Sequence, residues 1–203
     1  MSYIDQVQDI SQPVTDRGMA TKKKLLEAAD GCFGQRGFFP TSIVDITREA
    51  GVAPGTFYNY FSSKEAILRE LVHNLNHKLR KATAIAIEGA PNRLEAERAG
   101  FRAFLEWVRN HRNSYRVVRQ SEFVDKEMFR WYYRKLGEGY VQGLQAAMDA
   151  GEVAHYNPEV LAYCLMGIGD FMGMRYVLWQ EEEVPEDVFE EMMRFILSGL
   201  ERR

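Results

Sequence analysis

The sequence predicts an all-α protein of about nine helices, with a short three-helix module at the N-terminal end and a longer helical body behind it. Apolar residues recur at helical spacing along nearly the whole chain, for example at Phe101, Phe104, Leu105 and Val108. No convincing run shows the alternation of period two that a half-buried strand requires. Glycines and prolines divide the pattern into helices, with breaks predicted at Gly37, Phe39-Pro40, Gly51, Gly89-Ala90-Pro91, Gly151, Asn157-Pro158 and Val184-Pro185.

Length limits the number of domains, and the distribution of charge along the chain bears on contact with DNA. The chain has 203 residues, of which 46% are hydrophobic, enough for one substantial core or for a small module beside a larger domain. The formal net charge is −3, but residues 17–80 hold ten basic and six acidic side chains, whereas residues 81–203 hold sixteen and twenty. A basic N-terminal module joined to an acidic body is compatible with DNA contact through one end of the protein.

The N-terminal segment and the cysteines indicate a cytoplasmic protein. Residues 1–16 contain neither a basic residue nor an apolar run, so they are predicted to be a mobile tail rather than a signal peptide. Cys32 and Cys164 lie far apart on apolar stretches and form no CxxC pair. They are interpreted as buried thiols in a reducing compartment.

The first three predicted helices are short and carry clear end signals. The stretch "TKKKLLEAADGCF" leads to Gly37, which suits a left-handed C-terminal cap. The second helix begins at "TSIVD", where Thr41 or Ser42 can cap the N-terminus and Asp45 suits its positive end. Gly51 ends this helix. Two short helices joined by such a turn form a helix-turn-helix.

The third and fourth helices follow the turn directly. Pro54 suits the first turn of the third helix, and Ser62 and Glu65 have the spacing of a capping box for the fourth. Winding residues 54–61 at 100° per residue places Phe57 and Phe61 on one face, against the first helix.

The opposite face of residues 54–61 carries polar side chains that suit a reader of the DNA major groove. An asparagine at position 59 can pair with an adenine edge, and the methyl group of Thr56 can contact thymine. Tyrosine hydroxyls at positions 58 and 60 can reach phosphates, and Lys64 adds a positive charge. An ordinary helical hairpin with a polar outer face is the alternative interpretation of this local pattern.

The stretch "LLEAADGCFGQRGFFPTSIVDITREAGVAPGTFYNYFSSKEAIL" resembles the DNA-binding domain of the tetracycline-repressor (TetR) family over about fifty residues. The resemblance implies a DNA-binding domain at 17–66, followed at 67–203 by a domain for dimerisation and ligand binding. It also implies a transcriptional repressor that binds a palindromic operator in double-stranded DNA as a homodimer and is released by a small hydrophobic effector. The resemblance implies that DNA backbone phosphates are bound by Thr41, Ser42, Tyr58, Tyr60 and Lys64. It also implies that base edges are approached by Gly55, Thr56 and Asn59.

The last two helices, predicted at about 158–179 and 186–201, have broad apolar faces that a monomer would cover with difficulty, so a four-helix dimer bundle is expected. The stretch from Val160 to Trp179 is long enough to test as a membrane span, but Asp170 and Arg175 lie inside it. We therefore interpret it as a buried helix of a soluble protein.

The central helices are rich in aromatic residues, most of which we assign to the core, and the family resemblance implies a ligand pocket among the others. Ionisable residues within apolar stretches are the better candidates for ligand recognition. The candidate ligand-binding residues are Phe104, Trp107, Val108, Tyr115, Arg119, Glu122, Phe123, Phe129, Tyr133, Phe171 and Arg175.

The C-terminal part resembles family members that respond to acyl-CoA thioesters, so an acyl-CoA is one predicted effector. The aromatic residues would receive the acyl chain, and the phosphates would be held by Arg109, Arg112, Arg116, Arg119, Arg130 and Arg134. The alternative is an efflux-type repressor that senses a flat hydrophobic drug or metabolite and leaves these arginines in solvent.

No pattern in the sequence indicates an enzyme, a metal site or a cofactor. His73 and His77 lie four residues apart without a third ligand, and the Glu152-to-His155 spacing typical of di-iron bundles occurs only once. A helical ligand-binding protein or enzyme with a vestigial helix-turn-helix is the alternative from a different functional class, and the intact polar face at residues 55–60 favours the repressor.

Overall fold

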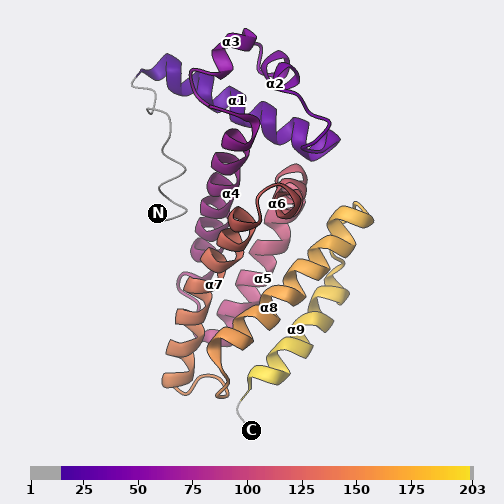
Figure 1. The fold of residues 1–203 in the computed structure, drawn as a ribbon. Coiled ribbons are helices and arrows are strands. Elements are labelled where there is room, and N and C mark those ends of the chain that lie inside the picture. Colours follow the sequence, from indigo (N-terminus) through magenta and orange to yellow (C-terminus); the bar gives the residue numbers. More distant parts are fainter. Residues whose placement is uncertain (1–14, 202–203) are drawn as a thin grey trace. The chain divides into compact units, whose positions relative to one another are not determined.

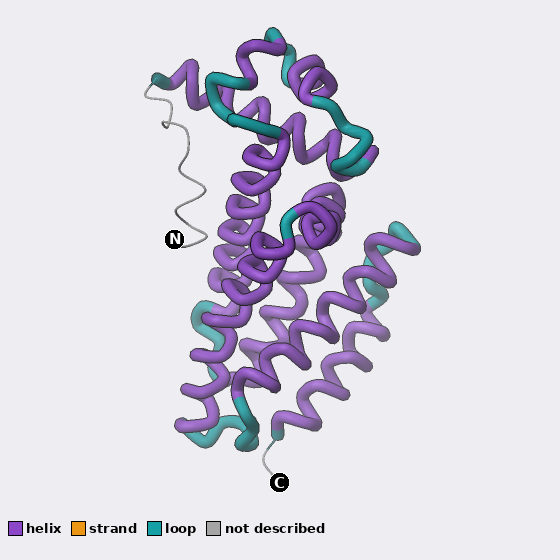
Figure 2. Tube along the Cα trace, viewed as in Figure 1, coloured by secondary structure: helices purple, strands orange, loops and turns teal. Residues whose placement is uncertain are grey.

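The computed structural model describes residues 15–201, and within that range the chain forms helices joined by loops, with no strand (Figures 1 and 2). The all-α prediction is confirmed. The helices are α1 (Asp16–Arg36), α2 (Ile43–Glu49), α3 (Pro54–Phe57), α4 (Lys64–Ile87), α5 (Arg93–Asn110), α6 (Arg112–Val124), α7 (Lys126–Asp149), α8 (Pro158–Gly173), the π-helix η2 (Met174–Trp179) and α9 (Glu186–Leu200).

The N-terminal end of α1 overlaps the predicted tail. Thr15 caps this helix by accepting a hydrogen bond from the backbone N–H of Gly18 at 3.1 Å, and Asp16 is its first residue. The remainder of the predicted tail, residues 1–14, lies outside the described part of the chain. At the other end of α1, Gly37 has a φ of 92° and a ψ of 159°. This backbone suits glycine, but it is not the left-handed helical cap that the sequence predicts.

Two further predictions at residue level need correction. The cap of α4 is Ser63, whose Oγ accepts a hydrogen bond from Ala66 N at 3.1 Å, and not the predicted pair of Ser62 and Glu65. Of the two cysteines predicted to be buried, Cys32 is buried, whereas Cys164 is exposed on α8. Residue spacing placed Cys164 on an apolar helix but could not show which side of that helix faces outward.

The chain folds into two compact units, and neither is a continuous segment. The first unit contains the described residues up to Leu75 together with Asn113–Tyr132, and the second contains Asn76–Arg112 together with the chain from Tyr133 onward. Helices α4 and α7 therefore begin in the first unit and end in the second. The first unit extends beyond the predicted domain boundary at residue 66 and includes most of α6. The boundary between the predicted DNA-binding and ligand-binding domains stays a prediction.

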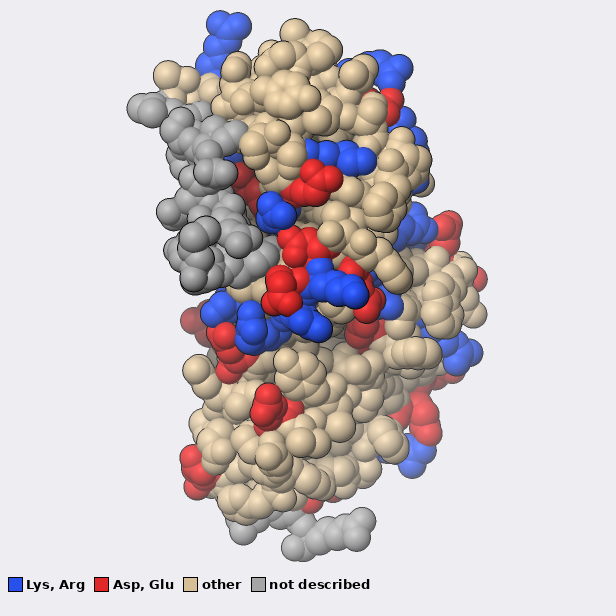
Figure 3. All heavy atoms as spheres, viewed as in Figure 1, with Lys and Arg blue, Asp and Glu red and all other residues tan. Residues whose placement is uncertain are grey.

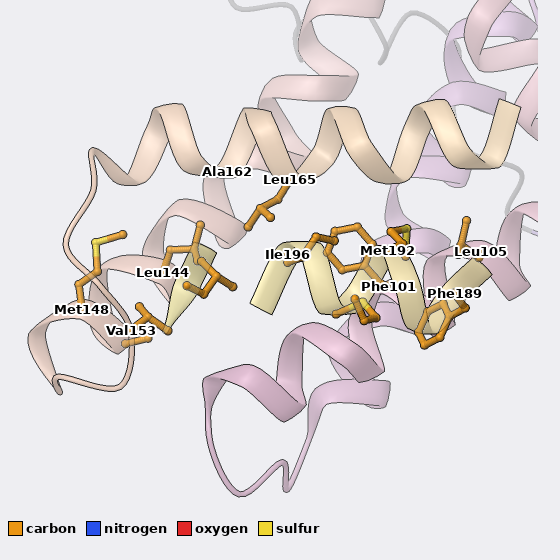
Figure 4. Packing of buried hydrophobic residues seen from close by; sticks show 13 residues of the cluster. Phe101, Leu105, Leu144, Met148, Val153, Ala162, Leu165, Phe189, Met192 and Ile196 are labelled. Atoms are coloured by element: carbon orange, nitrogen blue, oxygen red, sulfur yellow. The ribbon is translucent and has the colours of Figure 1, made fainter. Parts of the chain in front are cut away.

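The second unit has a hydrophobic core to which α5, α7, α8 and α9 each contribute (Figure 4). Phe101 and Leu105 of α5 lie beside Phe189, Met192 and Ile196 of α9, and the other labelled residues come from α7, α8 and the loop between them. The loop residue Val153 is fully buried in this core. Full burial of a Val, Leu, Ile, Phe or Met side chain contributes about 1.5–3 kcal/mol to folding. The shared core therefore stabilises the packing of these four helices.

The stretch from Val160 to Trp179 forms most of α8 and all of η2, and it is not buried throughout as predicted. Val160, Tyr163, Phe171 and Trp179 are exposed on it. Within residues 15–201, no helix combines the length and the apolar character needed to cross a membrane. Exposed aromatic residues on an apolar helix are a candidate contact surface.

Candidate nucleic-acid interface

The N-terminus of α2 is fixed by a reciprocal pair of hydrogen bonds between Ser42 and Asp45. The hydroxyl of Ser42 accepts from Asp45 N at 3.1 Å, and the carboxylate of Asp45 accepts from Ser42 N at 3.0 Å. Hydrogen bonds from Ser42, and to a lesser degree the nearby guanidinium groups of Arg36 and Arg48, lower the pKa of Asp45 to about 2. The predicted cap is therefore Ser42 and not Thr41, and this capping box defines where α2 begins.

The turn between α2 and α3 lies at Gly51, where the sequence predicts that the second helix ends. Gly51 has a φ of 67°, and a Cβ built on it would touch nothing within 4 Å, so the positive φ alone requires glycine there. Val52 N donates to Thr47 O at 3.0 Å and closes the turn. Pro54 then occupies the first turn of α3, as predicted.

Helix α3 is a single turn anchored by two buried phenylalanines. Phe57 and Phe61 are almost fully buried, and their ring centroids lie 5.6 Å apart. The helical hydrogen-bond pattern ends at Phe57, but Tyr60 N and Phe61 N both donate to Phe57 O at 3.0 Å. The predicted inner face is therefore present, although the helix itself is shorter than the predicted span of 54–61.

The outward side of α3 and of the turn that follows presents the predicted polar face. Tyr58 is 59% exposed, Asn59 and Gly55 are also exposed, and Thr56 and Tyr60 are half-buried. A Cβ on Gly55 would meet nothing within 4 Å, and its φ is not positive, so neither packing nor backbone conformation inside the chain requires glycine there. A glycine of this kind suits a surface that another molecule approaches closely.

Thr41 and Lys64, predicted to contact phosphates, use their polar groups inside the protein. Thr41 is 1% exposed, and its hydroxyl donates to Gly37 O at 2.7 Å. The ammonium of Lys64 donates to Phe38 O and Thr41 O at 2.8 Å each, and it lies 4.2 Å from the centre of the Phe38 ring. Both side chains hold the loop between α1 and α2, and Lys64 is only half-buried. Their predicted phosphate contacts stay predictions.

The structure adds two candidate surface residues that the motif analysis missed. Arg48 is exposed on α2 and pairs with Asp45 one turn earlier, and Val44 is exposed on the same helix. The sequence signal for Arg48 was its position in a helix whose other face carries Ile46 and Thr47, both buried. Arg48 lies in the last turn of α2, and an anionic partner at its guanidinium would have to replace Asp45.

Comparison with known proteins identifies the family. A model of the bacterial regulatory proteins of the tetR family matches residues 25–71, which include α2, α3 and the start of α4. The HTH-type transcriptional regulator BetI of Rhizobium meliloti is 30% identical over 138 residues, which is 64% of this chain and 68% of that protein. The chain belongs to the tetR family of bacterial regulatory proteins. Its expected membership and its helix-turn-helix are thereby confirmed.

Other similar proteins match nearly the whole length of this chain. The uncharacterized HTH-type transcriptional regulator YdgC of Bacillus subtilis is 26% identical over 188 residues, covering 91% of this chain and 94% of that protein. The fatty acid degradation regulator FadR of Bacillus halodurans has the same fold, with a TM-score of 0.82 at 15% identity over 95% of this chain and all of that one. FadR of Bacillus subtilis, in complex with stearoyl-CoA, gives a TM-score of 0.79 at 18% identity over 87% of this chain and 98% of that one.

The predicted ligand-binding residues of this tetR-family protein are divided between the two units. The first unit holds Tyr115, Arg119, Glu122, Phe123 and Phe129, and the second holds Phe104, Trp107, Val108, Tyr133, Phe171 and Arg175. Tyr115, Trp107 and Val108 are buried, and Phe104, Phe129, Tyr133 and Arg119 are half-buried. Phe123, Glu122, Phe171 and Arg175 are exposed. Their role in binding a ligand stays a prediction.

Several of the arginines predicted to bind phosphates have partners within their own unit. Arg109 forms an ion pair with Glu183, Arg112 donates to Glu181 O at 2.6 Å, and Arg130 pairs with Glu127 at 2.8 Å. On the face drawn in Figure 3, acidic and basic side chains stand next to one another and do not form separate fields. A phosphate at these arginines would have to replace an existing partner.

Proposed function

We propose that this tetR-family regulator is a repressor that binds a near-palindromic operator as a homodimer and is released by a small hydrophobic effector. The observation that carries the DNA-binding part is the outward polar face of α3, where Tyr58 and Asn59 are exposed next to the open Gly55. This face is held by two buried phenylalanines and a closed turn, so it presents side chains in a fixed geometry.

Each exposed group has a role that its chemistry supports. Asn59 can bond the N6 and N7 edge of an adenine, and Thr56 can contact a thymine methyl group. The hydroxyls of Tyr58, Tyr60 and Ser42 suit phosphate oxygens, and Gly55 allows the backbone to approach the groove. The structure favours positioning roles for Thr41 and Lys64, and Arg48 joins the phosphate contacts in their place.

The proposed dimer is supported by apolar side chains that the second unit leaves uncovered. Exposed aromatic and aliphatic residues occur on α8, η2 and α9, namely Val160, Tyr163, Phe171, Trp179 and Phe195. Gly167 of α8 and Gly199 of α9 are open as well, because a Cβ on either would meet nothing within 4 Å. An extended apolar surface with small residues suits close packing against a second copy of the same helices.

An acyl-CoA is the proposed effector. The FadR structure with stearoyl-CoA shares the fold of this chain, and half-buried aromatic residues such as Phe104 and Tyr133 suit an acyl chain. The rival effector is a hydrophobic drug or metabolite, and the ion pairs of Arg109 and Arg130 favour it, because both arginines already have acidic partners. Since the target is bacterial DNA, the proposed compartment is the cytoplasm.

The test is a selection of genomic fragments by the purified protein, followed by a release titration. We expect a selected sequence with two half-sites about one helical turn apart, or a multiple of it. Stearoyl-CoA should release this DNA, whereas stearate alone and CoA alone should not. Release by stearate would remove the role given to the arginines, and release by none of the three would discard the acyl-CoA. Failure to select any sequence would instead favour a ligand-binding protein or enzyme with a vestigial helix-turn-helix.

A further inference from the structure

Phe38, in the loop between α1 and α2, is held from three directions within the first unit. Its ring is buried against Phe33, with the ring centroids 5.2 Å apart. Its carbonyl accepts from the ammonium of Lys64 at 2.8 Å, and its N–H donates to the side-chain oxygen of Gln120 at 2.8 Å. The loop that leads into α2 is therefore fixed at one residue, Phe38, by residues from α1, α4 and α6.

Gln120 binds two points of this region with one amide. Its Oε1 accepts from Phe38 N, and its Nε2 donates to Phe33 O at 3.1 Å, near the end of α1. Reversing the amide would set two donors against each other and two acceptors against each other, so only one orientation satisfies both bonds. Gln120 lies 82 residues beyond Phe38 in the chain. Its amide thus joins α6 to the end of α1 and to the loop.

Two further contacts bring α6 and α1 together along the same side. A Cβ placed on Gly34 would lie 2.4 Å from the Cβ of Asn113, so glycine is needed for the approach at this point. One residue further on, the hydroxyl of Ser114 donates to Asp30 at 3.0 Å. Since packed interiors deform little, a displacement of α6 must be passed to α1 or must break these contacts.

The contacts continue from Phe38 to the start of α2. Lys64 bridges Phe38 O and Thr41 O, and the next residue, Ser42, caps α2. We propose that Gln120 is a positioning residue for DNA binding: its amide fixes Phe38 and so sets where α2 begins relative to α3. This inference rests on the proposed DNA-binding function.

The experiment compares Gln120→Met with a matched variant, Gln145→Met. Methionine keeps the length of the side chain but forms neither hydrogen bond. Gln145 is exposed on α7 in the second unit, where its side-chain amide donates to Asp149 at 2.8 Å. Each folded variant is titrated against the selected operator and against random DNA of equal length at one salt concentration. Hydrogen exchange of the Phe38 amide is measured in parallel.

We expect Gln120→Met to weaken operator binding by about tenfold and to speed Phe38 exchange by a similar factor, because two hydrogen bonds are lost. Random-DNA affinity should fall much less, and Gln145→Met should change neither property. A merely structural role would lower stability without changing the affinity ratio of the folded protein. A folded Gln120→Met variant with an unaltered operator-to-random ratio would therefore overturn the proposal.

A measurement on the unaltered protein covers the case in which the variant does not fold. If the operator selects the loop position that Gln120 fixes, saturation with operator must slow Phe38 exchange, by thermodynamic linkage. No slowing would overturn the proposal. If the unaltered protein selects no DNA sequence at all, the proposed function fails and this inference fails with it. A selected operator with an unaltered ratio for Gln120→Met rejects the role of Gln120 alone.

Discussion

At the scale of single residues, Lys64 forms internal hydrogen bonds that its place in the motif did not predict. Its ammonium bonds backbone carbonyls of the loop between α1 and α2. We expect Lys64→Met to lower the free energy of unfolding by about 1–3 kcal/mol, since two carbonyls lose a charged donor. The slope of log affinity for operator against log salt concentration should stay the same, because no phosphate contact is removed.

The control for this prediction is Lys78→Met, which removes an exposed lysine later on α4. It should leave both stability and the salt slope nearly unchanged. If Lys64→Met instead reduced the magnitude of the slope by about one, the phosphate contact predicted from the sequence would be correct.

Asn59 and Tyr58 are expected to differ in what they contribute to recognition. Asn59→Ala should relax the preference at one base pair of each half-site by about 1–3 kcal/mol, because a bidentate contact to a base is lost. Tyr58→Phe should weaken binding to all sequences alike, since a phosphate contact carries no sequence information. Competition between operator variants and random DNA measures both. Equal losses on operator and random DNA for Asn59→Ala would show that Asn59 reads no base.

His73 gives the first unit a dependence on pH that the sequence did not predict. Its ring stacks on Trp131 with centroids 3.7 Å apart, and desolvation lowers its pKa from 6.5 to about 4. Between these values the folded protein binds fewer protons than the unfolded chain, so the free energy of unfolding should fall as pH drops from 6.5 towards 4. The contribution of Asp45 is lost only at lower pH, between 3.8 and about 2.

Urea unfolding at several pH values, compared between the unaltered protein and His73→Phe, tests this prediction. The variant should show a smaller loss of stability between pH 6.5 and 4. Identical curves for the two proteins would mean that His73 is protonated in the folded state as readily as in the unfolded one.

At the scale of elements, two glycines of α1 should respond oppositely to the same substitution. Gly31 has open space where a Cβ would lie, so Gly31→Ala should stabilise the helix by up to about 1 kcal/mol through helix propensity. At Gly34 the new Cβ would meet Asn113 of α6, and the clash should cost about 1–3 kcal/mol. Thermal unfolding of the two variants is the measurement. Equal effects would mean that α1 and α6 do not approach each other as described.

The sequence predicts helix boundaries well where glycine or proline marks them, as at Gly89 to Pro91 and at Asn157-Pro158. It misses the breaks at His111 and Asp125, where neither residue occurs. Asp125 caps α7 with one carboxylate oxygen, bonded by Met128 N at 3.1 Å, and pairs with Arg69 of α4 through the other at 2.8 Å. The helix-turn-helix face was predictable because its residues are neighbours in the chain. The role of Gln120 was not, since its partners lie more than eighty residues away.

At the scale of the whole molecule, the exposed apolar side chains of α8 and α9 predict that dimerisation depends on them. Phe195 of α9 is 72% exposed. Phe195→Glu should raise the dimer dissociation constant by about a hundredfold, because a charge would replace a central apolar contact. Ile85→Glu is the control, since Ile85 is 59% exposed but lies on α4. Sedimentation that shows the unaltered protein as a monomer at micromolar concentration would contradict the dimer.

The chain passes three times between its two units, and this limits which segments can be exchanged by recombination during evolution. The backbone passes from one unit to the other at residues 75/76, 112/113 and 132/133. A recombination event that joined the first seventy-five residues to another body would inherit the whole helix-turn-helix. It would lose Asn113, Gln120 and Asp125, which contact the C-terminal end of α1, the loop after it and the first half of α4. A recombined protein that keeps this helix-turn-helix must therefore also keep residues 113–132, which complete the first unit.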